Sequence, residues 1–195
     1  MTKIKICGLK RLKDIGYVNE AKPDYAGFVL HFSRSHRSLS EEEATALRAR
    51  LLPEIPAVGV FVDQPMEIVV SLLKRGVIDI AQLHGSESPD YIRTLRRQTG
   101  KTVWKCFQIH SSTDVAEAAE SPADCLVLDN GRGTGRSFDW TLLEGFSRPY
   151  FLAGGLTPEN LDMAIKALHP WGVDLSSGVE SAQHKDRDKI LAAVA

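Results

Sequence analysis

Cysteine is scarce in this sequence, and long apolar runs are absent. The three cysteines, Cys7, Cys106 and Cys125, are odd in number and follow no regular spacing, which argues against a disulfide framework and a Cys-x-x-Cys metal site. The N-terminus is charged from Lys3 with no apolar segment after it, and no run approaches the roughly 20 apolar residues of a membrane span. We therefore expect a cytoplasmic protein with no membrane partner.

Neither sign of charge is in excess. Lysine and arginine number 24 and aspartate and glutamate 25, for a net charge of -1, so the composition gives no reason to expect nucleic acid or an anionic membrane as a partner. An anionic ligand would have to be bound locally. With 195 residues, 43% of them hydrophobic, the chain can bury a sizeable core, and we expect residues 1–195 to form one domain.

What the sequence does contain is a regular alternation of strand and helix patterns. Short apolar runs predict strands, and the stretches between them predict helices. A capping-box pattern, Ser40 followed by Glu43, opens the second helix. The predicted strands are 3–7, 24–30, 57–62, 78–83, 102–109, 124–128, 150–153 and 172–175, and the predicted helices are 12–19, 41–50, 66–74, 89–98, 113–119, 158–167 and 185–195.

Eight strands in strict alternation with helices predict an α/β fold, a single-domain (β/α)8 barrel (TIM barrel). The alternative is a doubly wound open sheet, and the glycine-rich stretch 131–135 is its best support. That stretch does not match the dinucleotide fingerprint, which needs Gly-x-Gly-x-x-Gly opening a helix directly after a strand. The barrel is therefore the predicted fold.

Cys7 lies at the C-terminal tip of the first predicted strand, where Gly8 ends the alternation of Ile4 and Ile6 with lysines. In a barrel this edge is where the active site is built. The alternative interpretation is a small buried hydrophobe, which is the one we prefer for Cys106 and Cys125 because they lie within strand runs.

Two late loops predict a phosphate site. Barrels often bind phosphate after strands seven and eight, where backbone amides and the start of a short helix face the anion. Both loops here are rich in small and hydroxyl residues, although either could by itself be an ordinary turn. The candidate phosphate-binding residues are Gly154, Gly155, Ser176, Ser177 and Gly178.

Other predicted strand tips supply polar side chains to the same mouth. Asp129 directly follows an apolar strand. Burying a carboxylate there costs free energy unless the group has a bonding partner or a function. Arg37 is a candidate for gripping an anionic group, whereas Arg34 is better explained as a solvated loop charge. His84 is either a structural or a functional residue. The candidates at the tips are Gln82, His84, Asp129 and Asp174.

Several motifs in order resemble one family. From Lys3 to about Lys189 the chain is similar to phosphoribosylanthranilate isomerase of tryptophan biosynthesis. The motifs are Lys5-Ile6-Cys7-Gly8, Gln82-Leu83-His84-Gly85, Leu128-Asp129-Asn130, Phe138-Asp139-Trp140, Ala153-Gly154-Gly155-Leu156 and 173–180. The resemblance implies a (β/α)8 barrel that performs an Amadori rearrangement of N-(5-phosphoribosyl)anthranilate to the 1-deoxyribulose phosphate isomer.

The same resemblance implies roles for individual residues. Cys7 would be the general base, Asp129 the general acid, and Arg37 the partner of the anthranilate carboxylate. Gln82, His84 and Asp174 would contact the substrate, and the two late loops would hold its phosphate. The chain departs from the family at 35–37, where the family has Ser-Pro-Arg, in a shorter loop after Asp129, and at 183–184, which replace a Pro-Gly turn.

The chemistry is expected to need no cofactor and no metal, because a Schiff base formed on the substrate is itself the electron sink. The expected partner is a small-molecule sugar phosphate, with the chain acting as a monomer or homodimer. Two other classes stay open. Another phosphate-handling barrel enzyme, an epimerase or an indole-forming synthase, would need a metal set, paired aspartates or a catalytic lysine at the strand tips. A non-catalytic sugar-phosphate binding module would have no use for Cys7 and Asp129 together.

Overall fold

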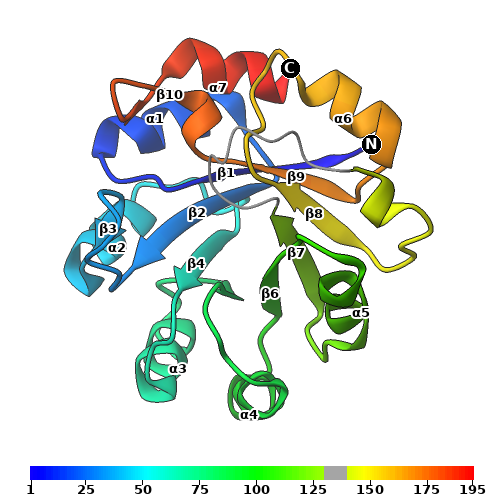
Figure 1. Cartoon of the computed structure of the whole chain (residues 1–195). Helices are drawn as coiled ribbons and strands as arrows, with labels where there is room; N and C mark the ends of the chain where they lie inside the picture. The colour runs from blue at the N-terminus through cyan, green and yellow to red at the C-terminus, as the bar shows by residue number, and fades with distance from the viewer. Residues whose placement is uncertain (130–139) are drawn as a thin grey trace.

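The computed structural model describes residues 1–129 and 140–195. In this part of the chain, eight parallel strands form a closed ring surrounded by helices (Figure 1). β1 pairs with both β2 and β9, which closes the barrel and contradicts the open-sheet alternative. The strands are β1 (Lys3–Cys7), β2 (Tyr25–Leu30), β4 (Ala57–Phe61), β5 (Ile80–Leu83), β6 (Val103–Gln108), β7 (Cys125–Asp129), β8 (Tyr150–Ala153) and β9 (Gly172–Leu175).

The helices lie outside the ring, and α7 lies beside α1, so the two ends of the chain share one side of the barrel (Figure 1). Serine side chains cap three helix starts, and the predicted Ser40–Glu43 capping box is confirmed. None of the described helices is long and apolar enough to cross a bilayer. They are α1 (Leu12–Ala21), α2 (Glu41–Arg48), α3 (Met66–Lys74), α4 (Pro89–Thr99), α5 (Ser112–Glu120), α6 (Leu161–Leu168) and α7 (Arg187–Val194).

Three predicted elements begin two or more residues later than expected, and in each the side chain just before the start accepts a backbone amide. The strand predicted from 78 begins at Ile80; before it, the Asp79 carboxylate accepts the Ala57 amide while the Asp79 amide donates to the Ala57 carbonyl. The helix predicted from 158 begins at Leu161, after Asn160 accepts the Thr157 amide. Asp186 caps α7, so that helix begins after it, at Arg187.

The sequence did not predict the shortest elements. They are the two-residue strands β3 (Ser38–Leu39), β10 (Glu180–Ser181) and β11 (His184–Lys185), and the 3-10 turns η1 (Trp140–Leu143) and η2 (Ser177–Val179). β3 extends the sheet beside β2, and β10 with β11 forms a hairpin after β9. Segments of two residues carry no periodicity, so only their pairing partners define them.

Aromatic side chains pack together in one of the two buried apolar clusters of the barrel. Trp104 stacks on Phe151 with ring centroids 4.6 Å apart, and Tyr25 meets both rings edge-on. Gly172 makes room for this packing, because a Cβ there would lie 2.3 Å from the Phe151 ring. Alternation along β6 and β7 places Cys106 and Cys125 in the same cluster, where both are buried as expected.

We expect Phe151→Ala to destabilise the protein strongly. The ring is fully buried, and truncation of such a ring usually costs about 3 to 5 kcal/mol because the cavity cannot collapse completely. The free energy of unfolding, measured in urea, reports the loss. Leu12→Ala is the control, since Leu12 is 62% exposed and should change the free energy by less than about 0.5 kcal/mol. Equal losses in the two variants would contradict this account of the core.

Candidate active site

A cavity of about 600 Å³ opens at the C-terminal ends of the strands. It contains the predicted site residues with one exception. Gly178 does not line the cavity; a Cβ there would lie 1.8 Å from the Leu156 carbonyl oxygen, so this glycine lets the loop after β9 pack on the loop after β8. Arg34 also faces the cavity. The predicted residues that line it are Cys7, Arg37, Gln82, His84, Asp129, Gly154, Gly155, Asp174, Ser176 and Ser177.

Two glycines shape the surroundings of Cys7 at the end of β1. Cys7 is the register partner of Gly27 on β2, and a Cβ at Gly27 would lie 2.8 Å from the Cys7 Sγ. Gly8 has a φ of 79°, and a Cβ there would lie 2.3 Å from the Arg37 side chain. The thiol and the guanidinium therefore occupy space that only glycine leaves open.

Beneath the thiol, a lysine and an aspartate form a buried ion pair. The Lys5 Nζ lies 2.6 Å from an Asp174 carboxylate oxygen, and the lysine is fully buried. Burial raises the pKa of the Cys7 thiol, and the nearby Lys5 ammonium acts in the opposite direction. Burial also opposes the charge of Lys5, but its interactions with Asp174 and Cys7 together outweigh burial and leave the pKa of Lys5 raised. The resting thiol is therefore protonated near neutral pH, above a lysine that stays charged.

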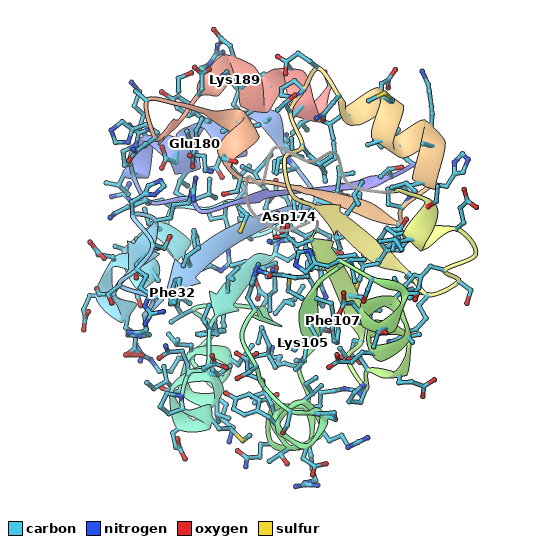
Figure 2. All side chains as sticks on the ribbon, in the orientation of Figure 1. Phe32, Lys105, Phe107, Asp174, Glu180 and Lys189 are labelled. Atoms are coloured by element: carbon cyan, nitrogen blue, oxygen red, sulfur yellow. The ribbon has the colours of Figure 1, made fainter. Side chains whose placement is uncertain are left out.

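Arg37 is held in place by the hairpin that follows β9. Its Nε and Nη2 donate to the two carboxylate oxygens of Glu180 at 2.7 and 2.6 Å, and the buried Lys185 Nζ donates to Glu180 at 2.7 Å. Burial disfavours the Glu180 charge, but the hydrogen bonds from Arg37 and Lys185 outweigh it and lower the pKa to about 2. Figure 2 shows Glu180 on the hairpin and Asp174 near the centre of the barrel mouth.

Two departures from the family pattern leave the local turns intact. In the loop that carries Arg37, the Ser35 hydroxyl accepts the Arg37 amide, and the Ser35 amide donates to the Phe32 carbonyl. In the hairpin, Ala182 and Gln183 both have positive φ, as a two-residue hairpin turn requires. Both turns form without proline or glycine. The shorter loop after Asp129 lies outside the described residues.

His84 sits among three polar side chains at the ends of β5, β6 and β7. Its Nδ1 is 3.5 Å from the Gln82 amide nitrogen, and its Nε2 is 3.5 Å from Cys106 Sγ and 4.0 Å from an Asp129 oxygen. Burial lowers the pKa of His84, so the imidazole is neutral near pH 7. In the described residues, His84, Cys106 and Asp129 form the one group that could hold a metal ion.

The loop after His84 is fixed from below by a buried charge pair. Lys105 donates to the Gly85 carbonyl at 2.5 Å and pairs with Glu87 at 3.1 Å, and Glu87 in turn accepts the Gly85 amide at 3.0 Å. This network holds both polar groups of Gly85. The position of His84 is therefore set by the protein and does not need a ligand.

Two buried oxygens in the cavity wall have no hydrogen-bond partner among the described residues. They are the side-chain oxygen Oε1 of Gln82 and the second carboxylate oxygen Oδ1 of Asp174. A buried acceptor without a partner is costly. Both atoms are suited to accept hydrogen bonds from the hydroxyl groups of a ligand.

Three residues of the site were not predicted from the sequence: Lys5, Glu180 and Lys185. Lys5 alternates with isoleucine, a pattern typical of a strand with one solvated face. Its side chain is instead fully buried in the barrel interior. Glu180 and Lys185 lie in a hairpin that the sequence did not predict. The sequence signal that could have identified Glu180 and Lys185 is their position, because both residues follow the C-terminal end of the last barrel strand closely.

Comparison with known proteins identifies similar chains along the whole length. A family model described as N-(5'-phosphoribosyl)anthranilate (PRA) isomerase matches residues 4–195. The N-(5'-phosphoribosyl)anthranilate isomerase of Caldanaerobacter subterraneus is 41% identical over 201 residues, covering 100% of this chain and 97% of the relative. That of Endomicrobium trichonymphae is 43% identical over 199 residues, with the same coverage.

Solved structures agree with these sequence comparisons. The phosphoribosyl anthranilate isomerase of Thermotoga maritima superposes with a TM-score of 0.90 at 32% identity, covering 100% of this chain and 97% of that one. A phosphoribosyl anthranilate isomerase solved with reduced 1-(o-carboxyphenylamino)-1-deoxyribulose 5-phosphate gives a TM-score of 0.89, also at 32% identity and with the same coverage.

We expect Glu180→Gln to destabilise the protein in a pH-dependent way. The folded pKa of about 2 lies below the ordinary value of 4.5, so the charge stabilises the fold fully above about pH 4.5 and progressively less as the pH falls toward 2. At pH 7 the variant leaves Arg37 and Lys185 without their carboxylate, which should cost about 3 kcal/mol.

Urea unfolding of the variant and of wild type at pH 7 and pH 3.5 tests this expectation, and the difference between them should shrink at the lower pH. Glu117→Gln is the matched control, because Glu117 is exposed on α5. A difference between Glu180→Gln and wild type that is the same at both pH values would show that the charge of Glu180 is not what stabilises the hairpin.

Proposed function

This chain belongs to the N-(5'-phosphoribosyl)anthranilate isomerase family, and we propose that Cys7 and Asp129 are the general base and the general acid of its reaction. It is an enzyme of tryptophan biosynthesis that converts N-(5'-phosphoribosyl)anthranilate to 1-(2-carboxyphenylamino)-1-deoxyribulose 5-phosphate. The observation that carries the assignment of roles is that Cys7 and Asp129 line one cavity together with both glycine- and serine-rich late loops.

The reaction needs one proton donor and one proton acceptor. Asp129 would protonate the ring oxygen of the sugar while the anilino nitrogen forms a Schiff base and the ring opens. Cys7 would first lose its thiol proton to solvent, and the thiolate would then remove the proton from the neighbouring carbon. The electron pair of that C–H bond moves into the protonated Schiff base to give an enol-amine, which tautomerises to the ketone. Electrons only move within the substrate, so no redox partner takes part.

Lys5 is the group that makes a buried thiol usable as a base. Burial keeps Cys7 protonated in the resting site, and the Lys5 ammonium contributes most to favouring the thiolate. Asp174 keeps Lys5 charged by pairing with it at 2.6 Å. The ion pair thus supports the base without contacting the reacting carbon.

The remaining cavity residues suit the other parts of the substrate. Glu180 uses the N–H of Nε and one N–H of Nη2 of Arg37, which leaves the second N–H of Nη2 and both of Nη1 for the anthranilate carboxylate in our assignment. The unpartnered oxygens of Gln82 and Asp174 would accept hydrogen bonds from ribose hydroxyls, with His84 beside them. The phosphate would be held by Gly154, Gly155, Ser176 and Ser177, and Gly178, which does not line the cavity, would contribute by letting the two loops pack together.

The setting of the enzyme is also part of the proposal. We propose that residues 1–195 form one domain, that the protein works in the cytoplasm with a sugar phosphate as its only partner, and that it is a monomer or a homodimer. One of the similar solved structures is described as mutually generated monomers of the dimeric phosphoribosylanthranilate isomerase from Thermotoga maritima. That description mentions both monomers and a dimer, so it supports either oligomeric state for a chain of this fold.

We expect Cys7→Ser to keep the fold and lose most of the activity. A serine hydroxyl is a far weaker base than a thiolate near neutral pH, so kcat should fall at least about 100-fold. The measurement is the loss of anthranilate fluorescence from N-(5'-phosphoribosyl)anthranilate, which wild type should cause and the variant should not. Cys125→Ala, at a buried cysteine of the aromatic cluster, should stay active. Near wild-type turnover in Cys7→Ser would remove Cys7 as the base.

We expect Asp129→Asn to lower kcat far more than it changes KM. Asparagine keeps the size and hydrogen-bonding capacity of the side chain but cannot supply the proton, so the loss should be roughly 10²- to 10⁴-fold, or about 3 to 5 kcal/mol of barrier. Steady-state kinetics and thermal melting of the variant are measured together. A variant that melts earlier but remains active would show that Asp129 has a structural role and that another group is the acid.

A further inference from the structure

Three neighbouring strands bring together a set of side chains that the isomerase reaction does not use as a set. His84 follows β5, Cys106 lies in β6, and Asp129 ends β7. Their nitrogen, sulfur and oxygen atoms all lie within 4.8 Å of one another. An imidazole, a thiol and a carboxylate are the three ligand types that Zn²⁺ takes in proteins, whereas Mg²⁺ prefers oxygen ligands alone.

The distances are close to those of a tetrahedral zinc site. Zinc-sulfur and zinc-nitrogen bonds of about 2.3 and 2.0 Å at a tetrahedral angle place the two ligand atoms about 3.5 Å apart. The distance between His84 Nε2 and Cys106 Sγ is 3.5 Å. The Asp129 oxygen is 4.0 Å from Nε2 and within 4.8 Å of the other ligand atoms, so its side chain has to move closer to complete three ligands.

Gln82, whose oxygen would face the substrate hydroxyls in the metal-free site, is also placed to fix the tautomer of His84 when a metal is bound. Its amide nitrogen lies 3.5 Å from His84 Nδ1, and its buried oxygen has no partner among the described residues. Rotating the amide by half a turn places that oxygen against Nδ1, which then carries the imidazole proton and leaves the Nε2 lone pair for a metal. A metal-bound histidine commonly donates its other N–H to such an acceptor.

We propose that His84, Cys106 and Asp129 bind one Zn²⁺ and that the bound ion inhibits the isomerase reversibly. The ion displaces the thiol proton of Cys106 to solvent, as a coordinating metal does, and no electron is transferred. His84 and Asp129 line the substrate cavity, so the fourth position of the ion opens toward it. Because the ion engages Asp129, metal and substrate exclude one another.

The kinetic test rests on the proposed function and compares wild type with Cys106→Ala and Cys125→Ala in buffered Zn²⁺. Zn²⁺ should raise the apparent KM of wild type at unchanged kcat, and chelation with EDTA should restore it, whereas Mg²⁺ should have no effect. Cys106→Ala, which keeps its basal activity, should need at least about 10-fold more Zn²⁺ for equal inhibition. Cys125→Ala should behave as wild type. Equal inhibition in Cys106→Ala and wild type, or none in wild type, would overturn the proposal.

A binding test does not depend on catalysis, so its failure is distinguishable from failure of the proposed function. Cd²⁺, used as a probe, should give the ultraviolet charge-transfer absorption of a metal-thiolate bond in wild type and in Cys7→Ser, and the absorption should be lost in Cys106→Ala. Cys7 is the cysteine that lines the cavity in the described part of the chain, so it is the alternative thiolate for a metal bound there. Absorption that persists in Cys106→Ala and disappears in Cys7→Ser would place the metal on the base and overturn the site.

Discussion

The buried ion pair between Lys5 and Asp174 links closure of the barrel to the chemistry at its mouth. The two residues are register partners on β1 and β9, the first and last strands of the ring. Either charge alone in this interior would carry a large desolvation cost, so each strand presents an inner face that is compatible with the fold only when the other is in place. The same ammonium lies under Cys7 and favours its thiolate. One contact therefore supports both the closed sheet and the proposed base.

A second hydrogen-bonded network fixes the rim of the cavity, as the ion pair between Lys5 and Asp174 fixes the barrel interior. Arg37 comes from the loop between β2 and β3, whereas Glu180 and Lys185 come from the hairpin after β9. Their hydrogen bonds hold the guanidinium at the cavity, and Gly8 leaves the space that it occupies. Segments from the two ends of the chain thus position the proposed carboxylate-binding group. Proline in the arginine loop is not needed, because hydrogen bonds of Ser35 define that turn.

Most of the fold and part of the site could be predicted from local patterns. The apolar run that ends at Asp129 and the alternation that ends at Cys7 marked strand tips correctly, because a strand ends where its pattern breaks. The partners of these residues could not be predicted. His84 gives the clearest example: its neighbour Cys106 lies on the next strand, and the sequence alone favoured a purely structural burial for that cysteine.

The sequence by itself determined the number and order of the barrel strands, the family, and which residues stand at the strand ends, since period-two runs, capping residues and short motifs are local properties of the chain. Only the tertiary structure decided which charges meet. Lys5 pairs with Asp174 across 169 residues, and Arg37 pairs with Glu180 across 143. The physical reason is that such pairs depend on how the closed sheet brings its first and last strands together and on the loops that cross its mouth, and no local pattern encodes either.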